Sequence, residues 1–385
     1  MLKNIFLPNI ISRPSPSLKQ LLLSPKLEKD KADTIYFKYG RDALLNGLKL
    51  FKIPVSSSII VPSYMCNSFI RPALDYGYKI IFQDIDHELN FEIDELKINI
   101  LNSDAKAIIV VNFFGFKSNI DEIKKSLKLP SLVIIEDHSH SCLSNDAFNQ
   151  PVLVPDMAIF SLRKNLPVIN AGVLRVNVHK NSHLIPKIDR LHKSIRTDAI
   201  TKIKNLKDET FYLLIRMIEF IVSSFGLFNI YSKRITNIKN SSKNLEKVYK
   251  PIKPSFMINA YMNSKNYKKK INQKIIKNYN QINKKMALLG FKPFFKDLPK
   301  DCIPQYAIFL DQTGELFDYL RKNRIGASKW PAHEIPNEIA NAKASFPNSN
   351  YFNDNLILLP IHQNIQNKHQ KRILDTIATW QNGKV

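Results

Sequence analysis

Two residues of opposite charge follow short apolar runs of the chain. Asp137 comes at the end of the run in IIEDHSH, and Lys164 comes three residues after Ser161 in DMAIFSLRKN. A lysine that is partly desolvated, with the guanidinium of Arg163 beside it, keeps enough neutral amine to attack a carbonyl. A carboxylate at a buried strand end can pair with a protonated ring nitrogen. The pair therefore indicates Schiff-base chemistry on an aromatic aldehyde.

A third feature offers a place for an anion. Gly40 opens a segment with helical spacing in FKYGRDALLNGL, and the free N–H groups of a helix N-terminus bind phosphate. Each feature alone is common, because acids at strand ends often cap helices and lysines after strands are usually solvated. In this order on successive strands they meet the needs of pyridoxal phosphate. We predict that cofactor, with Lys164 as the Schiff-base lysine and Asp137 at the ring nitrogen.

The elements that must position these residues form an alternating pattern between about Tyr36 and Asn177. Short apolar runs rich in β-branched residues alternate with segments whose apolar residues recur every three to four positions, as in a helix. The runs are SSIIVPS, YKIIFQDID, AKAIIVVNFFG, SLVIIEDHSH, DMAIFSL and GVLRVNV. Such runs are typical of strands buried on both faces, with helices between them. The pattern predicts an α/β domain around a mostly parallel sheet, with ligands at the carboxyl ends of the strands.

The second half of the chain has a different composition. A Pro- and Lys-rich linker, KVYKPIKPS, lies near Lys250 and precedes a long polar helix at about 259–289. After this helix come, in order, the strand-like QYAIFLD, the helical GELFDYLRKN, the irregular KWPAHEIPNE, the strand-like NLILLPIH and a closing helix. We predict a large α/β domain over 1–250 and a smaller α+β domain over 251–385. Trp330 either shapes a substrate pocket or anchors a buried loop.

One long apolar stretch, FYLLIRMIEFIVSSFGLFNIY at 211–231, could be read as a membrane span. Arg216 and Glu219 interrupt it, and their spacing lets them pair on one helix face. We therefore predict a buried or dimer-interface helix. A peripheral contact with a membrane surface is the alternative.

Charge and cysteine content set further limits. The chain has 57 Lys and Arg against 33 Asp and Glu, a net charge of +24, which attracts anionic ligands. The basic residues are spread out without a nucleic-acid-binding module, so we expect no nucleic-acid partner.

Three distant cysteines without a CxxC pair favour a reducing cytoplasm over disulfides or zinc, and the N-terminus lacks signal-peptide features. His138 and His140 lack a third ligand, so no metal is expected.

Several motifs together resemble one family. Their order along the chain is the one seen in DegT/DnrJ/StrS pyridoxal-phosphate-dependent sugar aminotransferases. The motifs are GRDAL, VPSYMCNSFIRPALDYGYKIIFQDID, AIIVVNFFGF, IIEDHSHS, FSLRKNLPVINAGVL and NLILLPIHQNIQ. The resemblance covers about Tyr36 to Ala378. It implies fold type I, the aspartate-aminotransferase-like fold, with a seven-stranded-type sheet and a smaller C-terminal domain. It also implies a homodimer with the active site at the subunit interface.

The resemblance carries roles over to individual residues. Asp137 and Lys164 match the family's pyridinium partner and Schiff-base lysine, and His140 stands where the family uses Gln to bond the cofactor's 3-oxygen. The phosphate contacts that it implies are Ser161, Gly40, Arg41 and Asp42.

This chain also departs from the family pattern. Cys66 stands where an aromatic residue commonly stacks on the cofactor ring, and a thiol cannot stack. The interval from Ser161 to Lys164 is shorter by two residues, and the following GG is Ala171-Gly172 here. These changes bear on the cofactor's geometry and the substrate more than on the fold.

The resemblance implies an aminotransferase that moves an amino group from glutamate to a nucleotide-linked keto-sugar in polysaccharide or glycoconjugate biosynthesis. A sugar dehydratase on the same fold is an alternative, although in that branch the lysine is replaced, typically by His, and Lys164 is present here. A non-catalytic descendant that kept the fold is another. A basic nucleic-acid-binding protein is the remaining alternative, and it predicts salt-sensitive binding.

Overall fold

The computed structural model describes residues 10–14, 32–127, 131–144, 147–168, 171–195, 207, 211, 214–215, 250–254, 258, 261 and 265–383. The apolar stretch 211–231 and the first part of the linker lie almost wholly outside the described residues, so the predictions made for them are not taken further. Within the described part of the chain, no helix is both long and apolar enough to cross a bilayer.

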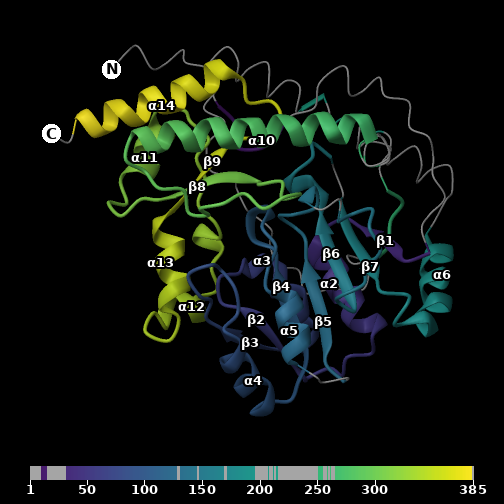
Figure 1. The fold of residues 1–385 in the computed structure, drawn as a ribbon. Helices are drawn as coiled ribbons and strands as arrows, with labels where there is room; N and C mark the ends of the chain where they lie inside the picture. Colours follow the sequence, from purple (N-terminus) through teal and green to yellow (C-terminus); the bar gives the residue numbers. More distant parts are fainter. Residues whose placement is uncertain are drawn as a thin grey trace.

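A seven-stranded sheet forms the centre of the molecule (Figure 1). Its strands in spatial order are β1 (Thr34–Phe37), β7 (Gly172–Val176), β6 (Met157–Ser161), β5 (Val133–Asp137), β4 (Ala105–Val111), β2 (Ser58–Pro62) and β3 (Lys79–Gln83). β7 is antiparallel to both of its neighbours, and the other neighbouring pairs are parallel. The predicted mostly parallel sheet is confirmed, and each of the six apolar runs contains one strand.

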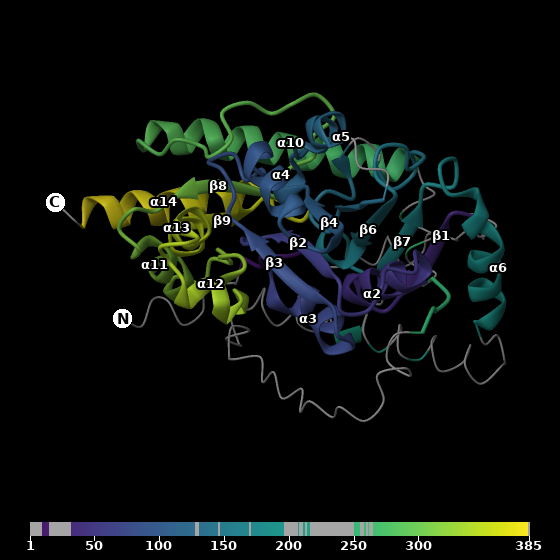
Figure 2. The same ribbon diagram turned by 90° about the horizontal axis from the view of Figure 1, so that it is seen from below.

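Helices cover both faces of this sheet (Figure 2). They are α2 (Gly40–Leu50), α3 (Asn67–Tyr76), α4 (Ile93–Leu101), α5 (Ile120–Ser126) and α6 (Ile185–Ser194), with short 3-10 turns η2 (Phe113–Gly115), η4 (Leu162–Lys164) and η5 (Ser182–Leu184). Successive strand residues point to opposite faces. Ile59 accordingly packs in one cluster with Leu44 of α2, whereas Ile60 packs in another with Leu96 of α4 and Ile123 of α5.

The C-terminal part of the chain mixes helices with a second, two-stranded sheet. Its elements are α10 (Lys265–Leu288), β8 (Tyr306–Leu310), α11 (Leu316–Lys322), η6 (Ala332–Glu334), α12 (Asn337–Asn341), α13 (Pro347–Asn355), β9 (Leu356–Pro360) and α14 (Asn367–Asn382). β8 and β9 pair antiparallel. The expected long helix, both strands and the closing helix are therefore present, while the boundary at residue 250 stays a prediction.

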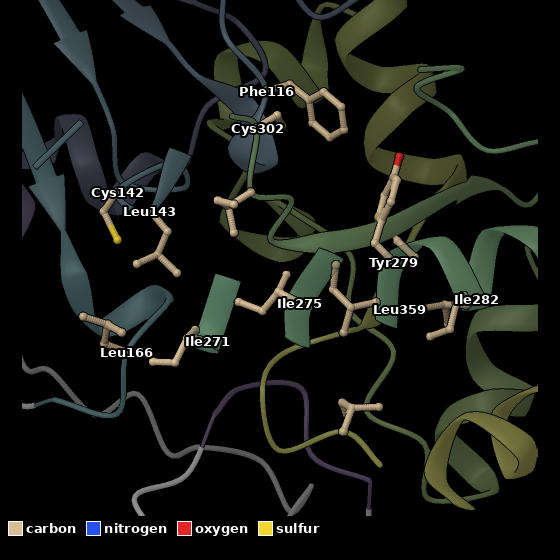
Figure 3. Close-up of a cluster of buried hydrophobic side chains, with 14 of the residues drawn as sticks. Phe116, Cys142, Leu143, Leu166, Ile271, Ile275, Tyr279, Ile282, Cys302 and Leu359 are labelled. Atoms are coloured by element: carbon tan, nitrogen blue, oxygen red, sulfur yellow. The ribbon is translucent and has the colours of Figure 1, made fainter. Parts of the chain in front are cut away.

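The two parts of the chain share buried apolar contacts. Ile271, Ile275 and Tyr279 line one side of α10 in the same hydrophobic cluster as Leu166, which follows η4, and Phe116, which follows η2 (Figure 3). A second cluster joins residues of β8 and β9 to the strands of the large sheet. This packing holds the C-terminal part over the edge of the sheet where β4, β5 and β6 end.

Candidate active site

Asp137 and Lys164 lie at the carboxyl ends of two adjacent parallel strands. Asp137 is the last residue of β5, is buried, and accepts a hydrogen bond of 2.8 Å from the backbone N–H of Ser139. Lys164 ends the 3-10 turn η4 that follows β6. Burial lowers the pKa of the Lys164 amine, and the charge of Asp137 opposes that shift. Burial likewise raises the pKa of Asp137, against the charge of Lys164. Each residue therefore acts on the ionisation of the other.

His140 lies directly against the lysine amine. Its Nε2 atom is 2.9 Å from Lys164 Nζ, and its Nδ1 atom accepts the backbone N–H of Phe114 at 3.5 Å. Burial, followed by the charge of Lys164, holds the pKa of His140 well below its ordinary value. A neutral ring that accepts at Nδ1 carries its proton on Nε2, and that N–H can donate only to an unprotonated amine. The contact therefore favours the nucleophilic form of Lys164.

Aromatic side chains surround this pair. The His140 ring stacks on Phe114 with centroids 5.3 Å apart and meets the edge of Trp330 at 4.8 Å. Lys164 Nζ lies 5.9 Å from the centroid of the Trp330 ring. The Tyr64 hydroxyl donates to the backbone carbonyl of Trp330. Trp330 thus brings the C-terminal part of the chain to the lysine, a position that suits either of the two roles expected for it.

The start of α2 lies against the end of β6. A Cβ atom placed on Gly40 would be 3.5 Å from Ser161 Cβ, which shows how near the helix N-terminus is to that serine. The approach depends on Gly172, which pairs with Ser161 across β6 and β7. A Cβ atom on Gly172 would lie 2.1 Å from the carbonyl carbon and oxygen of Tyr39. The glycine retained from the family's GG pair therefore keeps the helix start in place.

The two residues after Gly40 take different positions. Asp42 is buried, and its Oδ2 atom accepts the backbone N–H of Tyr39 at 3.1 Å, so it caps the helix. Burial raises the pKa of Asp42 to about 6. The Arg41 guanidinium lies 4.3 Å from the centroid of the Tyr39 ring, and that of Arg163 lies 5.2 Å from the same ring. The helix start therefore combines free N–H groups and two guanidinium groups with one carboxyl that caps it.

Cys66 is the N-cap of α3 and is partly buried beside the site. Its Sγ atom donates to Glu334 Oε2 at 2.5 Å and lies 2.8 Å from Ser68 Oγ. Burial, then the hydrogen bond to Glu334, raises the pKa of the thiol. The contact joins α3 to η6 of the C-terminal part. Cys66 therefore fastens the segment that carries Trp330.

Other residues near the lysine were not predicted from the sequence. Gln305 donates through Nε2 to the Lys164 carbonyl at 3.2 Å, and Asn165 donates through Nδ2 to the His140 carbonyl at 3.4 Å. Arg13 acts on the pKa of both Lys164 and His140 through its charge. Asn165 adjoins the lysine motif, but Gln305 and Arg13 come from distant parts of the chain. No local pattern marks these two.

The described residues contain no group of His, Cys, Asp and Glu side chains arranged to hold a metal ion. His138, the second histidine of the motif, is bonded elsewhere. Its Nε2 atom is 3.2 Å from Glu136 Oε2, its Nδ1 atom is 2.9 Å from Ser141 Oγ, and its ring stacks on Phe160.

The arrangement fits the chemistry of pyridoxal phosphate. A partly buried amine and a buried carboxylate follow adjacent parallel strands and act on one another's ionisation, and these are the two groups that would hold the cofactor's aldehyde and its ring nitrogen. The free N–H groups at the start of α2, next to Ser161, suit a phosphate. The residues present are therefore of the types that this cofactor requires.

Sequence comparison agrees with this geometry. A sequence model of the DegT/DnrJ/EryC1/StrS aminotransferase family matches residues 30–197, which include the strands and turns just described. The model covers 168 of the 385 residues, and over this segment the chain is similar to that family. The segment holds Asp137, His140 and Lys164, so the family's own pattern covers the proposed catalytic centre.

Curated relatives match shorter stretches. The chain is 34% identical over 91 residues to the GDP-4-keto-6-deoxy-D-mannose 3-dehydratase of Escherichia coli O55:H7, and the match spans 23% of each protein. It is 31% identical over 134 residues to the UDP-4-amino-4,6-dideoxy-N-acetyl-beta-L-altrosamine transaminase of Campylobacter jejuni, spanning 34% of each. These matches cover about a quarter to a third of the length of the relatives.

A solved structure extends the likeness of fold over nearly the whole chain. The aminotransferase PseC of Helicobacter pylori, involved in the biosynthesis of pseudoaminic acid, superposes with a TM-score of 0.65. The alignment covers 97% of this chain and 98% of PseC at 16% sequence identity. The chain therefore has the fold of this aminotransferase, which is fold type I.

Proposed function

We propose that the protein is a pyridoxal-phosphate-dependent aminotransferase. The observation that carries this proposal is the contact between Lys164 Nζ and the neutral ring of His140, 2.9 Å apart, with Asp137 acting on the same amine. A solvated lysine would be an ammonium ion and no nucleophile. Here burial and the histidine together favour the free amine that a Schiff base needs.

The residues have distinct roles in the proposed reaction. When bound, pyridoxal phosphate supplies an aldehyde and a ring that accepts electrons from the substrate. Lys164 Nζ would hold the cofactor through its aldehyde carbon and would move a proton at the α-carbon of the amino donor. Asp137 would pair with the ring nitrogen and favour its protonated form, and His140 orients the lysine amine. The start of α2, with Gly40, Arg41 and Ser161, holds the phosphate, while Asp42 secures that helix start.

For the substrates we infer a nucleotide-linked keto-sugar as acceptor and glutamate as amino donor, in the biosynthesis of a polysaccharide or glycoconjugate. The names of both curated relatives refer to nucleotide-linked sugars, which supports this substrate class. The net charge of +24 favours a ligand with a diphosphate. We further infer a cytoplasmic homodimer, in agreement with three free cysteines at positions 66, 142 and 302.

One experiment tests the aminotransferase proposal. Pyridoxal phosphate is added to the purified protein, free cofactor is removed, and the visible spectrum is followed as L-glutamate is added. We expect a protein-bound absorbance that glutamate bleaches and that a 2-oxo acid restores, because the amino group moves onto the cofactor and off again. A protein that binds no cofactor, or whose absorbance responds to no amino acid, contradicts the proposal.

The sugar dehydratase remains a second candidate. It is favoured by the 34% identity to a 3-dehydratase and by a histidine ring 2.9 Å from the lysine amine. A dehydratase would eliminate a hydroxyl group of a nucleotide-linked keto-sugar as water. Bound cofactor with activity that survives Lys164→His would favour it, whereas loss of activity in that variant favours transamination.

A further inference from the structure

The N-terminal segment 10–14 is held against the C-terminal part of the chain. The Ile10 backbone N–H donates to the Arg324 carbonyl at 3.0 Å, and the Gly326 N–H donates to the Ile10 carbonyl at 2.6 Å. A Cβ atom at Gly326 would lie 2.5 Å from that same carbonyl oxygen. His362 Nε2 lies 3.0 Å from the Ile11 carbonyl. The backbone just before Arg13 is thus held by the C-terminal part of the chain.

This segment closes one side of a hollow that contains the lysine. Ser12 and Pro14 line the hollow together with Lys164, Asn165 and Tyr306. In the sequence Arg13 lies between Ser12 and Pro14, and its side chain makes a hydrogen bond to the Tyr306 hydroxyl. Its guanidinium also acts electrostatically on Lys164. Arg13 is therefore a cation that is bonded to a residue of the hollow and is close enough to Lys164 to act on its charge.

Two hydrogen-bond acceptors border the same hollow. Asn165 Oδ1 and Gln305 Oε1 are buried, and neither has a hydrogen-bond partner among the described residues. The amide nitrogens of both side chains are engaged with backbone carbonyls, so the oxygens are the free ends. A buried acceptor without a partner costs free energy unless a ligand satisfies it. The hollow thus suits a ligand that has N–H donors next to an anionic group.

We propose that this hollow is the subsite for the amino donor, and that Arg13 binds the donor's α-carboxylate. The inference rests on the proposed aminotransferase function and names a specificity residue for it. In an amino acid the carboxylate is attached to the carbon that bears the reacting amine, so it must lie within a few ångströms of Lys164. The phosphates of a nucleotide-sugar are separated from the keto carbon by the sugar ring. A cation next to the lysine therefore suits the amino acid.

The test compares donors in Arg13 variants of the cofactor-loaded protein. We expect Arg13→Gln to raise the apparent Kd for L-glutamate, read from bleaching, about 10- to 100-fold, while cofactor binding is unchanged. Arg13→Lys should recover part of the affinity, since lysine keeps the charge but lacks the planar fork. Lys106→Gln removes an exposed charge of β4 and should behave as wild type.

Amide analogues of glutamate identify the group that Arg13 binds. The α-amide, isoglutamine, should bind wild type much more weakly than glutamate does and should bind Arg13→Gln with the same affinity as wild type. The γ-amide, glutamine, keeps the α-carboxylate and should therefore still bind wild type more tightly than it binds Arg13→Gln. A second readout is Trp330 fluorescence of Lys164→Ala protein titrated with glutamate, with and without Arg13→Gln, because that ring lies beside residue 164.

The possible outcomes separate the two proposals. If wild type takes up no cofactor or does not respond to glutamate, the aminotransferase function and this subsite both fail. If wild type responds and Arg13→Gln binds glutamate within twofold of wild type, only the subsite is wrong. Weaker binding of a nucleoside diphosphate with unchanged glutamate affinity would assign Arg13 to the acceptor and overturn the proposal.

Discussion

At the scale of single residues, the site depends on opposite charges held at two strand ends. Asp137 is buried, accepts hydrogen bonds from the backbone and the side chain of Ser139, and has the cation of Lys164 within electrostatic reach. Lys164 lies between that acid and a neutral histidine. Such pairs are expensive to bury without a function, because desolvation offsets much of their attraction.

Removing the charge of Asp137 should weaken cofactor binding. Asp137→Asn keeps the shape and can keep the bond from the Ser139 N–H, but it cannot hold a ring nitrogen in its protonated form. A charge-assisted hydrogen bond is worth about 1.5–3 kcal/mol, so the Kd for pyridoxal phosphate should rise roughly 10- to 100-fold. Equilibrium dialysis measures the change, with the exposed Asp121→Asn as control. Equal affinity in both variants would show that Asp137 does not contact the cofactor.

Asp42 should make stability depend on pH. Its pKa rises from 3.8 in the unfolded chain to about 6 in the fold, so the folded state binds the proton more tightly. The unfolding free energy of the wild type relative to Asp42→Asn should therefore fall as pH rises from about 4 to 7. The upper bound is about 3 kcal/mol. Urea denaturation at several pH values measures the difference. A difference that is constant with pH, or that grows, would contradict the buried position of this carboxyl.

Sequence reasoning found the residues that share a motif and missed those that fold in from elsewhere. Asp137, His140, Ser161 and Lys164 lie within two strand ends, where type and spacing indicate their chemistry. Arg13 and Gln305 are far from them in sequence and reach the lysine only because the C-terminal part packs on the sheet edge.

At the scale of elements, hydrophobic patterns predicted most of the large sheet. The apolar runs were long enough to identify β2 to β7, since fully buried strands are apolar throughout. β1, of only four residues, was not predicted as a separate strand. The antiparallel direction of β7 was not predicted either, because direction depends on the connection and not on the residues within the strand.

At Gly172 the backbone of β7 approaches the residue before α2 too closely for a side chain to fit. Replacing it by alanine would place a Cβ atom 2.1 Å from backbone atoms of Tyr39, which cannot move aside without displacing the start of α2. We expect Gly172→Ala to lower the unfolding free energy by about 1–3 kcal/mol or more and to weaken cofactor binding. Gly383→Ala, whose nearest contact would be an ordinary 3.4 Å, is the control. Equal stability of these two variants in chemical denaturation would mean that helix and strand are not so close.

At the scale of the whole molecule, the two halves of the chain are joined by their cores. One hydrophobic cluster contains Phe160 of β6 with Ile271 of α10, and another contains Ile59 of β2 with Leu358 of β9. The division at residue 250 was inferred from a change in composition. Composition describes each part separately and does not report the contacts between them.

The shared clusters predict a single cooperative unfolding transition. Both tryptophans, Trp330 and Trp380, lie in the C-terminal part, so their fluorescence reports on that part, whereas circular dichroism reports on all helices and strands. We expect the two signals to change at the same urea concentration. A fluorescence transition well before the loss of circular dichroism would show that the C-terminal part unfolds independently.

The most direct measurement is the chemical identity of the lysine that carries the cofactor. The protein is loaded with pyridoxal phosphate, reduced with borohydride and digested, and the modified peptide is mapped by mass spectrometry. Our account predicts modification at Lys164, its absence in Lys164→Ala, and its retention in Lys329→Ala, which lies next to Trp330. A label that remains when residue 164 is alanine, or that is found on another lysine of the wild type, would contradict the account.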